Sequence, residues 1–414
     1  MSNTRTGQIR SERMTTVTHI SANGMSERRV HAGQAMNVLV VADHLGYPGG
    51  VVHGVTSYFL NVLPALARAG VNLTVCFLRD PHPAADELRE HGIDPIFLSS
   101  ARINPLVTFQ IADMARRGGC GILHAMGIKA TLMARLATYM IPARTILHLH
   151  DLVEPNPAVG QLHRIVARPS DTAVCVSRAI VPIAVRRYNV PPNRVHVVHN
   201  GIILERFQRV SDAARAGMRE SMGIKAGGPV MLVAGRMHPI KGHRAMLQMM
   251  PAIVRRCPDV VLLVAGDGPE RRACEELVRE LRLERNVKFL GQRRDIPELL
   301  QACDIVVVPS ESEGFCLAAV EAFAVGRPVV AFNCGGVGDV IEHGATGLLV
   351  PAGNRDAFVD ASASLLLDPA KRSSYGQNAR IAAMRFSLGR HVEQLLAVYT
   401  GAVASVGSGP AVVA

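Results

Sequence analysis

The 414-residue sequence predicts an α/β protein built from two doubly wound parallel sheets. Short β-branched apolar runs recur along the chain, and segments of helical composition separate them. Such runs are typical of strands that are buried on both faces of a parallel sheet. Glycine-rich turns follow several of the runs. Open α/β sheets bind their ligands at such turns, outside the carboxyl ends of the strands. The length is sufficient for two hydrophobic cores.

The first predicted domain covers residues 36–205. A polar segment, residues 1–35, precedes it, and we expect a disordered extension or an over-long start there, with Met36 as an alternative beginning. A helix is predicted at about residues 55–69, closed by Gly70. The predicted strands of this domain are 37–43, 72–78, 93–98, 121–125, 145–150, 172–177 and 194–200.

The second predicted domain covers residues 206–385, after a polar hinge at about 203–228. A helix is expected at residues 316–325, and the turn beginning at Gly266 opens a Glu-rich helix for which Asp267 is a natural N-cap. Residues 386–400 are predicted to form a helix, and residues 401–414 a disordered tail. The predicted strands of this domain are 229–234, 260–265, 287–291, 304–309, 328–332 and 347–350.

Composition narrows the function classes. The formal net charge is +11, but the arginines are scattered rather than gathered in one stripe, which argues against nucleic acid as a partner. An anionic substrate, or peripheral membrane contact through Arg186, Arg187 and Arg194, stays open, although a solvated helix face is the simpler interpretation of these arginines. The eight cysteines form no Cys-x-x-Cys pair, which favours reduced, buried thiols in a cytoplasmic protein.

Two carboxylates mark the stretch after the predicted strand 304–309. Glu313 lies in a loop and Glu321 on the helix that follows it. Eight residues advance a helix by about 12 Å, so the pair cannot chelate one atom but can hold two ends of an extended ligand. By spacing alone, a solvated glutamate in the loop and a surface glutamate on the helix are the favoured interpretation of the pair.

The complete string favours the ligand interpretation. Residues 309–336, PSESEGFCLAAVEAFAVGRPVVAFNCGG, resemble the signature of the retaining nucleotide-sugar glycosyltransferases with the GT-B fold. The resemblance implies two Rossmann-like domains facing a cleft, with a C-terminal helix that crosses back to the first domain. One departure is Cys316, where the family usually has Gly, and we expect its side chain to crowd the donor phosphate. The matching positions are Glu313, Glu321, Ala322, Gly326, Pro328–Val330 and Gly335–Gly336.

A glycine and two cations follow the predicted strand 229–234. They are Gly235, Arg236 and Lys241. Arg offers a planar fork and Lys a point charge, so the pair can clamp a diphosphate, although two surface cations are an equally simple interpretation. The resemblance places Arg236 and Lys241 on the donor phosphates.

The resemblance also implies that the turns after the other strands, and the loop before the predicted helix 316–325, bind the donor. The turns are expected beside the diphosphate and the base, Glu313 on the sugar hydroxyls and Glu321 on the ribose. The donor-binding positions are Gly49, Gly50, Gly266, Gly291, Gly314, Phe315, Cys316 and Leu317.

Histidines end three predicted strands, and a lone strand histidine is usually a core residue. His150 differs because it is the last residue of its strand and Asp151 follows it. It matches the family position at which a histidine contacts the donor sugar, with His124 expected as support behind it. The predicted catalytic residues are therefore His150, Glu313, Arg236 and Lys241.

These residues predict a retaining transferase that moves a hexosyl or N-acetylhexosaminyl group from a nucleoside-diphosphate sugar, with UDP as the favoured base, to an unidentified acceptor. No metal site and no cofactor are expected, because the sequence has no Asp-x-Asp pair for a divalent ion. A nucleotide-sugar epimerase of the same fold and a non-catalytic nucleotide-sugar-binding subunit are the alternatives.

Overall fold

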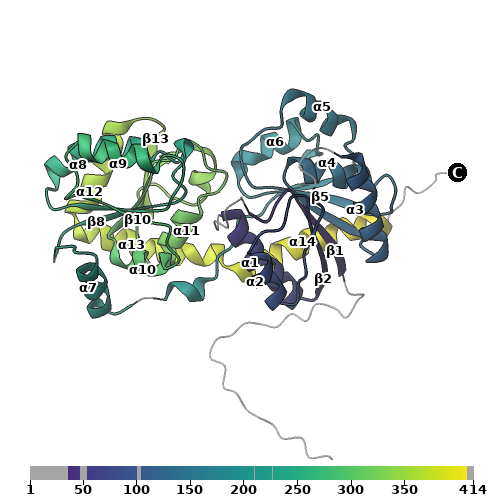
Figure 1. Cartoon of the computed structure of the whole chain (residues 1–414), viewed down its shortest axis with the longest axis horizontal. Coiled ribbons are helices and arrows are strands. Elements are labelled where there is room, and N and C mark those ends of the chain that lie inside the picture. Colours follow the sequence, from purple (N-terminus) through teal and green to yellow (C-terminus); the bar gives the residue numbers. More distant parts are fainter. Residues whose placement is uncertain (1–35, 47–53, 100–103, 209, 226, 408–414) are drawn as a thin grey trace, which may run out of the picture. The chain divides into compact units, whose positions relative to one another are not determined.

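The computed structural model describes residues 36–46, 54–99, 104–208, 210–225 and 227–407. One compact unit contains both sheets. Every strand pairing among the described residues is parallel, which confirms the predicted fold class. Helices lie on the faces of each sheet (Figure 1), because a parallel strand needs a crossover connection to reach its neighbour.

The first sheet has seven strands in the order β3-β2-β1-β4-β5-β6-β7. The order reverses at β1, which pairs with β2 on one side and with β4 on the other. The strands are β1 (Met36–Ala42), β2 (Val71–Phe77), β3 (Ile96–Phe97), β4 (Ile122–Met126), β5 (Arg144–Leu149), β6 (Thr172–Cys175) and β7 (Val195–Val197). The helices are α1 (Gly54–Arg68), α2 (Ala85–Glu90), α3 (Pro105–Arg117), α4 (Ile128–Ala137), α5 (Pro157–Ile165) and α6 (Val181–Arg186).

The second sheet has six strands in the order β10-β9-β8-β11-β12-β13, and it reverses at β8. The strands are β8 (Val230–Ala234), β9 (Val261–Ala265), β10 (Val287–Gly291), β11 (Ile305–Val308), β12 (Val329–Asn333) and β13 (Gly347–Pro351). The helices are α7 (Asp212–Ser221), α8 (His243–Arg256), α9 (Arg271–Glu280), α10 (Ile296–Ala302), α11 (Leu317–Ala324), α12 (Arg355–Leu367) and α13 (Pro369–Ala383).

The last helix, α14 (Leu388–Gly407), belongs to the core of the first sheet. Its side chains Leu395 and Tyr399 are fully buried in one cluster with Phe59 of α1. The yellow α14 lies alongside the purple α1 (Figure 1). The predicted crossing back to the first domain is therefore observed, but the predicted end of this helix at residue 400 is wrong, because α14 continues to Gly407.

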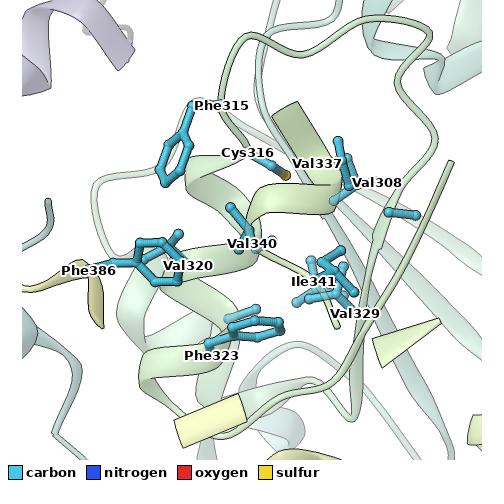
Figure 2. Close-up of a cluster of buried hydrophobic side chains, with 14 of the residues drawn as sticks. Val308, Phe315, Cys316, Val320, Phe323, Val329, Val337, Val340, Ile341 and Phe386 are labelled. Carbon is cyan, nitrogen blue, oxygen red and sulfur yellow. The ribbon is translucent and has the colours of Figure 1, made fainter. Parts of the chain in front are cut away.

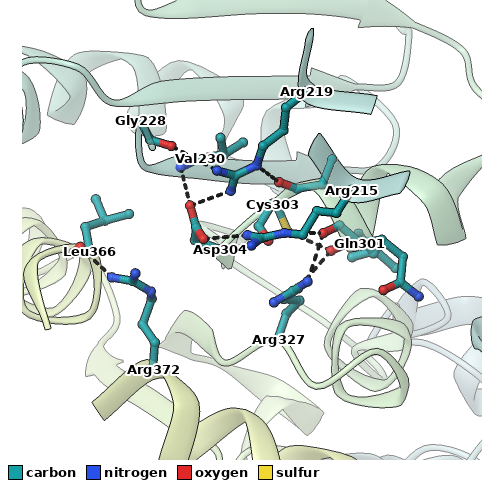
Figure 3. A network of polar contacts seen from close by, with 12 residues as sticks. Arg215, Arg219, Gly228, Val230, Gln301, Cys303, Asp304, Arg327, Leu366 and Arg372 are labelled. Atoms are coloured by element: carbon teal, nitrogen blue, oxygen red, sulfur yellow. Dashed lines mark hydrogen bonds and ion pairs between the residues drawn. The ribbon is translucent and has the colours of Figure 1, made fainter. Parts of the chain in front are cut away.

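Two local expectations differ from the structure. The polar hinge predicted at 203–228 contains α7, whose Arg215 and Arg219 both reach Asp304, at 2.7 and 2.8 Å (Figure 3). The interpretation of Asp267 as an N-cap is wrong, because α9 begins at Arg271 after Glu270. The Asp267 carboxylate instead accepts hydrogen bonds from the Gly268 N–H and from Arg271.

The prediction of buried thiols is confirmed: all eight cysteines are free and buried. Burial raises the pKa of Cys76 and of Cys175 to about 12. In the part of the chain that the structure describes, no helix combines the length and apolarity needed to cross a membrane.

Candidate functional site

Three turns at the carboxyl ends of β8, β9 and β10 join into one layer through backbone hydrogen bonds. The Gly235 N–H donates to the Ala265 carbonyl over 2.9 Å, and the Gly266 N–H donates to the Gly291 carbonyl over 2.8 Å. A Cβ on Gly266 would lie 1.9 Å from the Gly235 oxygen, so glycine is required there for the turns to pack. A Cβ on Gly235 would meet no atom of the described residues within 4 Å. The open space above Gly235 leaves its backbone accessible to a ligand.

The predicted cations lie directly after this layer. Arg236 is exposed beside Gly235, and Lys241 precedes α8. The turn between them is held by Gly242, whose φ of 71° and close approach to the Pro309 carbonyl exclude larger residues. The Glu311 N–H then donates to the Ile240 carbonyl over 2.9 Å. The loop after β8 and the loop after β11 are therefore one packed unit.

Lys241 and Glu313 form an ion pair inside this unit. The Lys241 Nζ lies 2.8 Å from Oε1 and 2.9 Å from Oε2 of Glu313. The Ser310 hydroxyl donates to the same Oε1 over 2.7 Å. The Glu313 side chain is only 11% exposed, whereas that of Lys241 is 33% exposed. The carboxylate is thus fixed in place, and the ammonium keeps a face toward solvent.

Glu321 lies on α11 with no hydrogen bond or ion pair among the described residues. Burial raises the pKa of this carboxyl to about 7, and the charge of Arg206 opposes that shift. An acid that is held without a partner in a partly buried position is available to a ligand that brings its own donors, such as a diol.

His150 follows β5, and the loop of Glu313 packs against its backbone. A Cβ on Gly314 would lie 2.2 Å from the His150 carbonyl oxygen. The structure thereby brings the backbone of His150 next to the loop that carries Glu313. Burial, together with the charges of His391 and His124, lowers the pKa of His150 to about 3. The imidazole is therefore neutral at neutral pH, and its buried Nε2 has no hydrogen-bond partner among the residues that the structure describes.

The expectation for Cys316 is wrong. Its side chain is 1% exposed and lies in the hydrophobic cluster with Val337 and Val340, so it does not face a ligand (Figure 2). Phe315 is also buried there, with its ring stacked on that of His199 at 5.6 Å. The helix begins only at Leu317, which is partly buried. The predicted positions Gly49 and Gly50 lie outside the described residues.

Sequence reasoning missed several polar residues near the site. Asp339 accepts hydrogen bonds from the Arg178 backbone N–H at 2.8 Å and from the Arg178 side chain at 3.1 Å, and His199 Nε2 lies 3.1 Å from its carboxylate. The Tyr58 ring contacts that of His150 at 4.6 Å between centroids, and Nε2 of His391 lies 3.3 Å from the Tyr58 hydroxyl. No local signal identifies these residues, because their partners are more than 90 residues away.

Two family models match the chain. Residues 215–382 match the model described as glycosyl transferases group 1, and residues 52–206 match that described as glycosyltransferase family 4. The D-inositol 3-phosphate glycosyltransferase of Saccharomonospora viridis is 35% identical over 62% of this chain and 61% of its own length. The N-acetyl-alpha-D-glucosaminyl L-malate synthase of Bacillus anthracis is 31% identical over 66% of this chain and 72% of its own. The chain thus spans about three fifths of the first of these relatives.

Solved structures share the fold. A glycosyltransferase from Rickettsia africae superposes with a TM-score of 0.79, at 20% identity, over 90% of this chain and 99% of that one. Anabaena HepE in complex with UDP superposes with a TM-score of 0.77, at 22% identity, over 88% and 100%.

Proposed function

Since this chain belongs to the group 1 glycosyltransferases, we propose that it moves a hexosyl or N-acetylhexosaminyl group from a UDP-linked sugar to an acceptor hydroxyl, with retention of the anomeric configuration. The observation that carries the proposal is the Lys241–Glu313 ion pair in a loop packed against His150. Together with Arg236, this loop offers cations for a diphosphate and polar groups for a sugar.

The reaction follows from these roles. The acceptor oxygen attacks the anomeric carbon on the face from which the diphosphate departs. The carbon–oxygen bond to the diphosphate breaks, a carbon–oxygen bond to the acceptor forms, and the acceptor proton passes to the departing phosphate oxygen. Arg236 and Lys241 stabilise the charge that develops on the diphosphate, which is where fixed cations lower a barrier most. Glu313 holds sugar hydroxyls, Glu321 the ribose diol, and His150 orients the sugar.

The names of the relatives suggest acceptors to try. One relative is named for D-inositol 3-phosphate and another for L-malate. Both compounds are small hydroxylated anions, and a chain of net charge +11 attracts anions. The UDP complex of Anabaena HepE supports UDP as the first base to test.

The test is a thermal-shift panel of UDP, GDP and ADP with their glucose, N-acetylglucosamine and mannose conjugates, followed by transfer to D-inositol 3-phosphate and L-malate. A ligand at about 100 times its Kd adds roughly 2.7 kcal/mol to stability. We expect a shift with a UDP-sugar and a product whose anomeric coupling in NMR matches that of the donor. Product with the opposite configuration contradicts retention. Epimerised nucleotide sugar without an acceptor, or binding without any product, contradicts transfer.

A further inference from the structure

A chain of buried ring side chains connects α14 to β5, the strand that His150 directly follows. His391 of α14 places Nδ1 2.7 Å from the His199 carbonyl oxygen and Nε2 3.3 Å from the Tyr58 hydroxyl. The same hydroxyl lies 3.3 Å from Nδ1 of His148 in β5. The residues His391, Tyr58 and His148 are 2%, 6% and 1% exposed. We call these three residues the ring chain.

The His199 carbonyl, which contacts His391, determines which ring atoms of the ring chain carry the protons. A carbonyl only accepts, so His391 carries its proton on Nδ1, and its Nε2 accepts from the Tyr58 hydroxyl. With its proton directed at His391, the Tyr58 oxygen can only accept from Nδ1 of His148, 3.3 Å away. The single Nδ1–H of His148 is then shared between this oxygen and Nε2 of His124, which lies closer at 2.9 Å and whose Nδ1 in turn contacts the Tyr399 hydroxyl. Burial lowers the pKa of His391 to about 4, so its ring is neutral at neutral pH.

At the far end of the ring chain, the rings of His148 and Tyr58 both contact the His150 ring. The centroid of His150 lies 4.1 Å from that of His148, and 4.6 Å from that of Tyr58 in an edge-on contact. Among the described residues, none forms a hydrogen bond to the His150 ring. Its orientation therefore depends on Tyr58 and His148, which are themselves fixed by hydrogen bonds.

The His391 end of the ring chain lies where the segment after β7 crosses the segment just before α14, two stretches that we call the linker segments. The Ile202 N–H donates to the Phe386 carbonyl over 2.9 Å, and the Leu388 N–H donates back to the Ile202 carbonyl over 2.8 Å. His391 packs on this crossing, since a Cβ on Gly201 would lie 2.8 Å from the His391 Cβ. The His391 ring is therefore in direct contact with the backbone of the crossing.

We infer that His391 is a positioning residue that acts through Tyr58 and His148 to orient His150, so that the crossing of the linker segments controls the geometry of the reaction centre. Only the turnover measurements that test this inference depend on the proposed transfer. The proton positions along the ring chain can be measured on the free protein.

The first experiment breaks the link between His391 and Tyr58 from each side. Tyr58→Phe keeps the ring against His150 and removes only the hydroxyl. His391→Asn keeps a nitrogen that donates to the His199 carbonyl and removes the acceptor for Tyr58. Each variant should lower kcat for UDP-sugar turnover at least about tenfold, with KM for the UDP-sugar within about twofold, because misorientation raises the barrier without removing a donor contact.

The double variant separates positioning from general stability. If both residues act through one link, the double variant turns over no more slowly than the worse single variant, whereas independent effects multiply. Tyr188→Phe is the matched control, since Tyr188 is a buried tyrosine of the same domain outside the ring chain. Multiplied losses, or an equal loss of kcat in Tyr188→Phe, would overturn the inference.

The second experiment reads the protons by NMR on full-length protein labelled with ¹⁵N-histidine, with His391→Asn to assign the signal. We expect the Nδ1–H tautomer for His391 and a shift of its Nε2 signal in Tyr58→Phe. An Nε2–H tautomer cannot accept from Tyr58 and would overturn the ring chain even with transfer intact. The expected tautomer in a protein that turns over no UDP-sugar would instead contradict the proposed function and leave the ring chain standing.

Discussion

The Lys241 ammonium holds Glu313 while it keeps a solvent-facing side for a phosphate. Replacing Lys241 with Met removes a cation from the diphosphate and leaves a buried carboxylate unpaired. We expect kcat/KM for the donor to fall by about 100- to 1,000-fold, measured by release of the nucleoside diphosphate. Lys225→Met is the control, because its pair with Asp259 is exposed. A Lys241→Met rate within about threefold of the wild type would exclude the clamp.

Glu321 should make stability depend on pH. Its folded pKa of about 7 lies above the ordinary glutamate value of 4.5, so between these values the unfolded state loses its proton first. The free energy of unfolding should therefore fall as pH rises from about 4.5 to 7. Glu321→Gln should remove this slope and melt higher than the wild type at pH 8, and it should bind the donor more weakly. Urea melts at pH 4.5 and pH 8 test this, and an unchanged slope would contradict it.

The sequence was sufficient to place residues that are tied to a local pattern, and their roles in transfer stay predictions. Arg236, Lys241, Glu313 and His150 lie at strand ends and helix starts, and the structure brings their loops together. It was insufficient for Cys316, because the direction of a side chain at a helix start depends on the core beneath it.

At the scale of the element, α7 shows how a polar helix is held without an apolar face. None of its residues is buried, so nothing in its pattern predicted a contact with the second sheet. Its arginines reach instead to the end of α10, where Arg219 donates to the Ala302 carbonyl over 2.8 Å and Arg215 to the Gln301 carbonyl over 3.0 Å (Figure 3). Free carbonyls at a helix end accept such donors readily.

We expect Arg219→Ala to lower the free energy of unfolding by about 3 kcal/mol, because it leaves Asp304 without one of its two cations and a helix end without a donor. Arg117→Ala, which breaks an exposed pair on α3, should cost about 0.5 kcal/mol or less. Denaturant melts measure both variants. Equal losses would mean that the Asp304 network contributes no more than a surface ion pair.

At the scale of the whole molecule, the last helix completes the core of the first sheet. The sequence predicted that this helix crosses back, but its polar contacts could not be foreseen, because His391 and Tyr58 are 333 residues apart.

Leu395 tests how much the first sheet depends on α14. Its side chain is fully buried in the cluster with Phe59 and Val62, so Leu395→Ala should lower the free energy of unfolding by about 3 kcal/mol. Val403→Ala, on the same helix but 44% exposed, should change it by less than about 0.5 kcal/mol. Guanidinium melts compare the two variants. A Leu395→Ala cost below about 1 kcal/mol would mean that the packing of α14 contributes little to the stability of the first sheet.

The buried thiols can report where and when the structure opens. A brief pulse of an alkylating reagent marks only those sulfurs that have become accessible, and mass spectrometry reads which ones they are. Cys76, Cys120 and Cys175 report on the first sheet, and Cys257 and Cys274 on the second. Cys316 lies at the start of α11, beside the loop of Glu313. A donor that closes this loop should slow the marking of Cys316 and leave that of Cys120 unchanged, which maps occupancy without any assay for the acceptor.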